Sequence, residues 1–158
     1  MIKDIIVKKT QNPDEGYTDK EQLYKDTLQH KEDVRKVLYE LSYKLKDIAD
    51  EHDWTKINYF DDFSKDCLER LNTPDFKKRD WYHIHTELER HHINAKVPNK
   101  VNLLDLLEMQ VDCIISGETR YGYVDKKFLE LSNSVLQEAY WNTIDLILEH
   151  IIVEAEYE

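Results

Sequence analysis

The sequence predicts an all-α protein built as a single bundle of five to six helices, and three observations support this. Only 3 Gly and 3 Pro occur among 158 residues, too few for the many hairpins of an all-β fold. Apolar residues recur at three- and four-residue steps, which is the helical period. The length suits one domain, since domains most often have roughly 100–150 residues. We therefore expect an N-terminal arm at residues 1–17 and one helical domain at residues 18–158.

One long helix, or two helices in series, is predicted to run from Thr18 to about Asp50. Thr18 and Glu21 form a capping-box pattern, in which two side chains satisfy free backbone groups at a helix start. An apolar stripe follows at Leu23, Leu28, Val34, Leu38, Leu41, Leu45 and Ile48. The preceding arm is a short strand or a loose tail, and it ends in a turn-rich segment at residues 12–16. The helix is expected to break at residues 51–53.

Two helical segments are predicted between residues 54 and 98. The first carries Phe60, Phe63, Cys67, Leu68 and Leu71 and ends at residues 72–74. Thr73 and Pro74 have the residue types that begin the next helix, which carries Trp81, His85 and Leu88 and reaches about Asn94.

Two more helices complete the prediction. Asn102 is expected to cap a helix that ends before Gly117, because glycine often follows a helix C-terminus. Ser132 or Asn133 is expected to cap a last helix that continues through Ile151. The acidic residues 153–158 are predicted to fray.

The formal charge of −11 limits the partners that the chain can bind. A surface this negative repels phosphate backbones, so general nucleic-acid binding is not expected. A bound divalent ion reverses the local charge, however, and a small anionic substrate remains compatible. No segment approaches the roughly 20 apolar residues of a membrane span, and no signal-peptide pattern occurs at the N-terminus. We expect a cytoplasmic protein without membrane contact.

Histidines and acidic residues form the candidate site. The dipeptide His52-Asp53 is preceded by His30 and followed by His85, His91, His92 and Asp112. Neutral imidazole and carboxylate are ligand types that hold divalent metals, and such a set suits Mn, Fe, Co, Ni or Zn, as one or two ions.

Helical spacing predicts the directions of these side chains. His30 lies four residues before Val34 on the apolar stripe, so its imidazole is expected to face inward. Glu108 and Asp112 lie one turn apart, about 6 Å along one side of a helix, and can converge on one centre.

The later histidines have a different geometry on a helix. His85 and His92 are expected to share a face, but they lie about 10 Å apart along the axis, too far to bind one ion unaided. The adjacent His91 and His92 cannot face the same way on a helix, so we expect one to be a ligand or phosphate contact and the other to be solvated.

The order of these residues resembles the HD-domain superfamily of metal-dependent phosphohydrolases. The residues that match, one by one, are His30, the pair His52-Asp53 and Asp112. The run His52-Asp53-x-Thr55-Lys56, with Trp81-x-x-x-His85 and His91-His92, is similar to a small bacterial and phage branch of that superfamily. The resemblance spans about residues 23–117, and the chain lacks the long insertions of nucleotide-cleaving members.

The resemblance implies an HD-like helical fold and a set of roles. The metal ligands are His30, His52, Asp53 and Asp112, while His85, His91 and His92 bind a second metal or phosphate. Lys56 contacts substrate phosphate. A metal with an open position generates hydroxide at neutral pH and polarises a phosphoryl oxygen. In that scheme Asp53 bridges two ions, and Glu108 orients a ligand or acts on the water.

We therefore predict that the protein is a metal-dependent phosphohydrolase that acts on a small phosphorylated compound, with a nucleotide as the first choice. Asp53, Lys56 and Glu108 are its candidate catalytic residues. The alternative is a non-catalytic acidic interaction protein, with a phage origin as one option, that retains an HD-like fold and a structural metal.

Individual residues also have simpler interpretations, which stay open. His30 can be a core histidine, and Asp53 can cap the following helix. Glu108 and Asp112 can pair with Lys or Arg from another helix.

Overall fold

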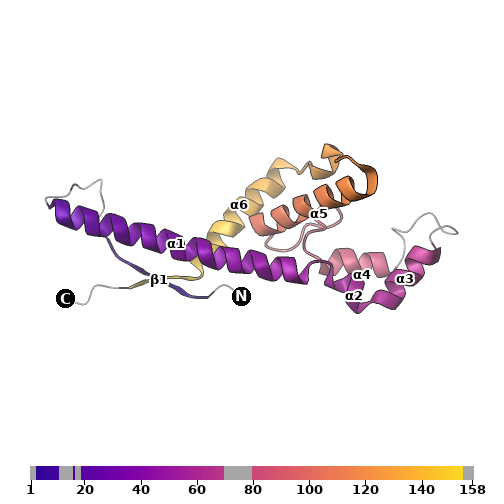
Figure 1. Ribbon diagram of the computed structural model, residues 1–158, viewed down its shortest axis with the longest axis horizontal. Helices are drawn as coiled ribbons and strands as arrows, with labels where there is room; N and C mark the ends of the chain where they lie inside the picture. The colour runs from indigo at the N-terminus through magenta and orange to yellow at the C-terminus, as the bar shows by residue number, and fades with distance from the viewer. Residues whose placement is uncertain (1–2, 11–15, 17–18, 70–79, 155–158) are drawn as a thin grey trace. The chain divides into compact units, whose positions relative to one another are not determined.

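The computed structural model describes residues 3–10, 16, 19–69 and 80–154, and helices dominate these ranges (Figure 1). The elements in chain order are β1 (Ile5–Lys8), α1 (Lys20–Glu51), α2 (Trp54–Asn58), α3 (Phe60–Glu69), α4 (Asp80–Leu88), α5 (Leu103–Tyr121), the 3₁₀ helix η3 (Lys126–Leu129), α6 (Asn133–Leu148) and β2 (Ile151–Glu154). The all-α prediction is confirmed. The predicted caps Thr18 and Thr73 lie outside the described residues. No described helix combines the length and apolar character needed to cross a membrane.

The chain forms two compact units. The first unit combines Met1–Asp47 with Ile144–Glu158, and the second is Ile48–Thr143. Both α1 and α6 contribute residues to each unit. The predicted arm therefore belongs with the start of α1 and the C-terminal segment.

In the first unit, the two strands come from opposite ends of the chain. β1 pairs in parallel with β2, with Ile5 opposite Ile151 and Lys8 opposite Glu154. β1 also contacts α1, because Lys36 Nζ donates to the carbonyl of Ile6 at 3.0 Å. The arm is thus a strand. The predicted extension of the last helix through Ile151 and the predicted fraying at 153–154 are wrong, since α6 ends at Leu148 and β2 follows.

The apolar stripe of α1 is only partly covered in its N-terminal half. Leu28, Val34 and Leu38 are 47%, 44% and 59% exposed. The buried residue of α1 is instead Asp33, whose carboxylate accepts from the backbone N–H of Lys8 and from Lys36 Nζ. A polar contact to β1, and not the apolar stripe, therefore marks the buried side here.

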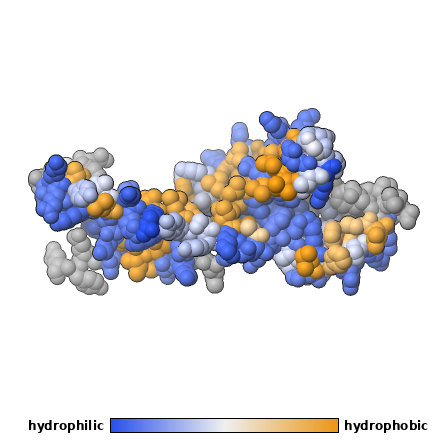
Figure 2. All heavy atoms as spheres, in the orientation of Figure 1, coloured by the Kyte–Doolittle hydropathy of each residue, from blue (hydrophilic) through white to orange (hydrophobic). Residues whose placement is uncertain are grey.

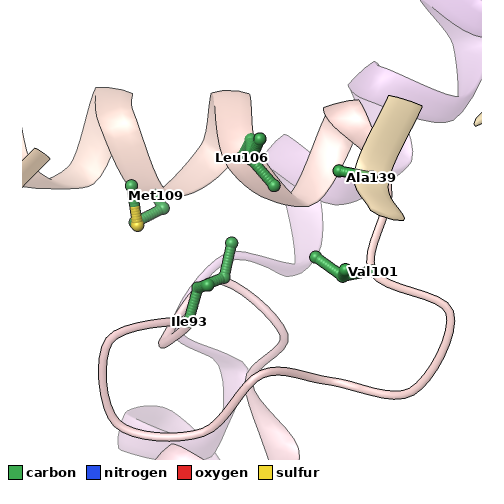
Figure 3. Packing of buried hydrophobic residues seen from close by; sticks show 5 residues of the cluster. All are labelled: Ile93, Val101, Leu106, Met109 and Ala139. Atoms are coloured by element: carbon green, nitrogen blue, oxygen red, sulfur yellow. The ribbon is translucent and has the colours of Figure 1, made fainter. Parts of the chain in front are cut away.

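The core of the second unit links α5 and α6 to the connection between α4 and α5. It consists of Ile93, Val101, Leu106, Met109 and Ala139. Figure 3 shows Ile93 and Val101 pointing from the connection toward the residues of α5 and α6. Ile93 and Val101 are 3% and 0% exposed, so apolar burial fixes the chain directly after His92 beside α5.

The start of α5 agrees with the sequence, whereas its end does not. The Asn102 side chain accepts hydrogen bonds from Leu104 N and Asp105 N, and the Asp105 side chain accepts from Asn102 N, so a complete capping box begins the helix. The predicted end before Gly117 is wrong. α5 continues to Tyr121 and ends at Gly122, which has a φ of 72°, a value that favours glycine.

Gly117 serves a packing role inside α5. A Cβ atom at this position would lie 2.8 Å from the Tyr123 carbonyl oxygen, because the chain folds back against the helix. We expect Gly117→Ala to destabilise the protein by up to about 2 kcal/mol, since a steric cost of about 1–3 kcal/mol is offset by the helix preference of alanine over glycine, about 1 kcal/mol. Urea denaturation measures the change. Gln110→Ala, at an exposed position of the same helix, is the control and should shift stability by less than about 0.5 kcal/mol. A stabilised Gly117→Ala protein would contradict this packing role.

Hydrophobic side chains also lie on the surface of α5. Figure 2 shows them gathered over α5 and α6. In α5, Val111 and Ile115 are 51% and 57% exposed, while Leu106 and Met109 are almost fully buried. The helix therefore buries one apolar side in the core of its unit and leaves other apolar residues at the surface.

Candidate metal centre

Asp53 lies at the junction between α1 and α2 in a conformation that turns the chain. Its φ of 58° and ψ of 24° are left-handed, and α2 begins at the next residue. The Asp53 side chain makes no capping hydrogen bond to α2, so the interpretation of this carboxylate as a helix cap is wrong. Both of its oxygens can face other groups.

Two histidines that follow α4 lie beside His85 because the helix ends early. α4 stops at Leu88, not near Asn94. Arg90 holds the turn that follows: its guanidinium donates to the carbonyls of Asn99 and Lys100 and pairs with Asp105 at 2.6 Å. The expected directions of His91 and His92 assumed helical geometry, which ends before these residues.

Four side chains consequently converge on one point. They are Asp53, His85, His91 and His92, and one ligand atom from each lies within 4.8 Å of every other. His85 Nε2 and His92 Nε2 are 2.6 Å apart, which corrects the expectation that these residues are too distant to share an ion. The Oδ1 atom of Asp53 lies 3.6 Å from His85 Nε2 and 3.7 Å from His91 Nε2. Ligand atoms on one tetrahedral zinc ion are about 3.4 Å apart, given bonds of about 2.0–2.1 Å. The two Asp53 distances are close to this value, whereas the two histidine nitrogens at 2.6 Å would have to separate to bind the same ion.

Buried polar atoms of two members of this group lack a hydrogen-bond partner among the described residues. His91 is 1% exposed, and its Nε2 has no hydrogen-bond partner within the described part of the chain. The same holds for Asp53 Oδ1. A buried polar atom without a partner is costly, and a cation between these two atoms would satisfy both. The residues present could therefore hold a metal ion.

A second group lies beside the first and shares His91 with it. It consists of His52, His91 and Glu108. Glu108 Oε1 lies 2.9 Å from His52 Nδ1 and 3.0 Å from His91 Nδ1. His52 Nε2 points the other way, 3.6 Å from Asp53 Oδ2 and 3.7 Å from Asp112 Oδ1. Glu108 and Asp112 thus contact histidines, which differs from the Lys or Arg partners of the salt-bridge interpretation.

Charge and burial separate the histidines into two kinds. The carboxylates of Asp112 and Glu108 raise the pKa of His52 to about 10. Burial lowers the pKa of His85 to about 3 and that of His92 to about 4. His85 and His92 are therefore neutral at pH 7, the state in which imidazole binds a metal.

The carboxylates beside His52 have lowered pKa values. Burial alone would raise the pKa of Glu108, but the hydrogen bond from His52 and the nearby imidazole of His91 lower this pKa to about 2. The neighbouring imidazole of His52, whose Nε2 lies 3.7 Å from Asp112 Oδ1, holds the pKa of Asp112 well below its usual range. Ser116 also donates to Asp112 Oδ1 at 3.1 Å.

His30 is the predicted ligand that does not join these groups. It lies in the part of α1 that belongs to the first unit, and its side chain is exposed, so the expectation of an inward imidazole is wrong. The physical reason is the partly exposed apolar stripe on which its direction was based. His52, Asp53 and Asp112, in contrast, do lie together.

An open pocket of about 620 Å³ adjoins the centre. Asp53, His85, His92 and Asp112 lie in its wall, together with the cationic residues Lys56 and Arg120. Lys56 Nζ pairs with Asp53 Oδ2. The pocket is also lined by the aromatic side chains of Phe63, Trp81, Tyr82 and Tyr121. The ligand group thus lies in the wall of a pocket that contains both charged and aromatic side chains.

Comparison with known proteins returned no match. No protein-family model, curated protein or solved structure matches this chain.

Sequence reasoning assigned no role to two residues that support the centre. Thr55 and Glu89 lie behind His85 and are almost fully buried. Glu89 is four residues after His85, a spacing that would place both on one side of a helix, and this was the available signal. Trp81 stacks on His85 with ring centroids 4.9 Å apart, a contact that the four-residue spacing also indicates.

Proposed function

We propose that this protein is a metal-dependent phosphohydrolase that acts on a small phosphorylated compound, with a nucleotide as the first candidate. One observation carries the proposal: the buried group of Asp53, His85, His91 and His92 opens on a pocket that also contains Lys56 and Arg120. The sequence resemblance to HD-domain phosphohydrolases supports the same activity.

The chain supplies the parts that such a reaction requires. When bound, a divalent ion provides a nucleophile at neutral pH by lowering the pKa of water, and it polarises a phosphoryl oxygen. Lys56 and Arg120 offer positive charge for the remaining phosphate oxygens. The aromatic side chains of the pocket offer a surface for a base or another flat group. Glu108 holds the Nδ1 sides of His52 and His91 and so orients both rings.

The geometry favours one ion at the group of Asp53, His85, His91 and His92. It also offers a position for a second ion. Asp53 Oδ1 faces His85 and His91, whereas Oδ2 faces His52 Nε2. This arrangement suits a bridging carboxylate. Lys56 Nζ also holds Oδ2, so a second ion at His52, Asp53 and Asp112 requires Lys56 to move toward substrate. We therefore propose that the site binds one or two ions of Mn, Fe, Co, Ni or Zn.

Metal analysis and an activity panel test the proposal together. The purified full chain is analysed for Mn, Fe, Co, Ni and Zn by mass spectrometry, then reconstituted with each metal and assayed for phosphate release from nucleotides and other small phosphorylated compounds. We expect a bound metal and metal-dependent turnover that chelation removes. Absence of both, across all metals and substrates, would overturn the proposal.

A structural metal site is the second candidate function, and the ligand count favours it. Asp53, His85, His91 and His92 make four ligands, and a tetrahedral ion with four protein ligands has no open position. Such a site would suit a non-catalytic interaction protein. This candidate predicts bound metal without turnover on any substrate of the panel.

Both candidates predict that metal stabilises the fold. A ligand that binds only the native state at 100 times its dissociation constant adds about 2.7 kcal/mol. We expect chelation to lower the melting temperature by about 5–10 °C, because each kcal/mol corresponds to about 2–4 °C at this chain length. Differential scanning calorimetry with and without chelator measures the shift. An unchanged melting temperature after chelation of a metal-loaded sample would contradict both candidates.

A further inference from the structure

A closed hydrogen-bond network lies directly behind His85, on the side away from the pocket. Thr55 Oγ1 donates to Glu89 Oε1 at 2.7 Å, and the Thr55 backbone N–H donates to the same oxygen at 2.9 Å. Thr55 Oγ1 also lies 2.6 Å from His85 Nδ1. Thr55, His85 and Glu89 are 0%, 2% and 6% exposed, so water does not compete for these contacts.

The network leaves one way to place the protons. A threonine hydroxyl carries a single proton, and Glu89 receives it. Thr55 Oγ1 can then only accept from His85 Nδ1, which must carry the proton of the neutral ring. The other nitrogen, His85 Nε2, therefore keeps its lone pair. That atom lies 2.6 Å from His92 Nε2 and 3.6 Å from Asp53 Oδ1.

The same contacts fix the positions of two elements. Glu89 follows the end of α4, and its carboxylate holds both the backbone and the side chain of Thr55 in α2. Thr55 is two residues after Asp53, and His85 lies one turn before Glu89. The network thus joins the segment that carries Asp53 to the helix that carries His85.

We propose that Glu89 and Thr55 are positioning residues that hold His85 as the Nδ1–H tautomer and so direct its Nε2 to a metal ion. This inference rests on the proposed metal site for its purpose, but the tautomer measurement that tests it does not. Histidines that bind metals commonly donate the second ring N–H to a carboxylate or carbonyl, and here a threonine hydroxyl relays that contact to a carboxylate.

The tautomer of His85 in the metal-free full chain is the decisive measurement. Nitrogen-15 shifts of the imidazole ring distinguish a protonated Nδ1 from a protonated Nε2. We expect Nδ1–H in the unmodified protein. In Glu89→Met the acceptor is lost, the Thr55 hydroxyl becomes free to donate to His85 Nδ1, and the tautomer should change to Nε2–H. Glu89→Gln retains a carbonyl oxygen that accepts both hydrogen bonds, and it should restore Nδ1–H.

Zinc affinity is the second readout, and threonine substitutions separate the relay from general packing. Thr55→Val removes the hydroxyl at nearly equal size, and we expect it to weaken zinc binding about 10–100-fold by competition with a zinc chelator. Thr55→Ser should retain affinity within about threefold. Thr86→Val is the matched control, because Thr86 is a buried threonine next to His85 whose hydroxyl donates to the carbonyls of Tyr82 and His83. It should change neither the tautomer nor the affinity.

The outcomes distinguish this inference from the proposed function. An Nε2–H tautomer in the unmodified protein, or an unchanged Nδ1–H tautomer in Glu89→Met, would overturn the relay. If Thr55→Val does not fold, Thr55→Ser and the Glu89 pair still decide it. If the unmodified protein binds no metal, the proposed function fails, while the tautomer measurements continue to test the network.

Discussion

Replacing Asp53 by Asn is expected to reduce metal-dependent turnover by about 10²–10³-fold, since metal charge stabilisation is worth several kcal/mol and each 1.36 kcal/mol is a factor of ten. Asp53 Oδ1 converges with the buried nitrogens of His85 and His91, and Oδ2 faces His52. An amide keeps the size of the side chain, but it loses the negative charge and one acceptor oxygen. The main consequence should be loss of the bound ion.

Asparagine is preferable to alanine here because of the backbone. Asp53 has a φ of 58°, and Asn adopts this left-handed conformation more readily than Ala does. Alanine would add backbone strain of about 1–2 kcal/mol to the loss of the ligand. We therefore expect the Asp53→Asn protein to fold and to keep its helical circular dichroism unchanged.

Metal content and initial rates under saturating metal provide the measurements for Asp53→Asn. Asp62→Asn is the matched control, because it makes the same chemical change at an exposed position in the first turn of α3. It should keep both metal and activity. Full turnover and full metal content in Asp53→Asn would show that the centre lies elsewhere.

The elements that the sequence predicted well depend on near neighbours in the chain. The capping box of Asn102 and Asp105 uses backbone groups within three residues, so residue type alone indicates it. Likewise, Ser132 Oγ accepts from Val135 N before α6, as expected of a cap. The break of α1 after Glu51 was also predicted, and the residues that follow it include the junction that carries Asp53.

The metal group could not be predicted in detail because distant contacts end α4. Arg90 reaches the carbonyls of Asn99 and Lys100 and the carboxylate of Asp105, and these contacts replace helical geometry after Leu88. Helical spacing therefore placed His91 and His92 on different sides, whereas the turn brings both toward His85. His91 and His92 were correctly named as candidates, but their shared position depends on tertiary structure.

His30 and the strands illustrate the same limit. The inward direction of His30 assumed that the apolar stripe of α1 is covered along its whole length, and Val34 and Leu38 are instead 44% and 59% exposed. β1 and β2 pair from opposite ends of the chain, and no local pattern identifies such a partner. The all-α class survived because two four-residue strands alter little of the chain.

The charge cluster around His52 gives the second large prediction, which concerns the pH dependence of the metal-free protein. The raised pKa of His52, about 10 against 6.5, contributes stability that is fully present below pH 6.5 and is lost as the pH rises toward 10. The lowered pKa of Glu108, about 2 against 4.5, contributes stability that is fully present above pH 4.5 and is lost as the pH falls toward 2. The two contributions together are therefore greatest between about pH 4.5 and 6.5.

Glu108→Gln should remove much of this pH dependence. The variant retains an oxygen that can accept from His52 Nδ1, but it loses the charge that stabilises the imidazolium. We expect a loss of about 1.5–3 kcal/mol at pH 6, the range for hydrogen bonds to charged groups, and a smaller loss at pH 9. Urea denaturation of chelator-treated protein from pH 3 to pH 9 measures both values.

Glu118→Gln provides the comparison for this variant, since Glu118 lies on the same helix and is exposed. Its stability profile should follow the unmodified protein within about 0.5 kcal/mol. A parallel offset of the Glu108→Gln profile at every pH would mean that Glu108 stabilises the fold by packing and not through its charge.

Proton release on metal binding shows whether His52 takes part in the site. An ion that takes His52 as a ligand must displace the imidazolium proton, so proton release on metal binding near pH 7 indicates that His52 is a ligand. An ion confined to Asp53, His85, His91 and His92 leaves His52 protonated, and His85 and His92, which are already neutral at that pH, release no proton when they bind it.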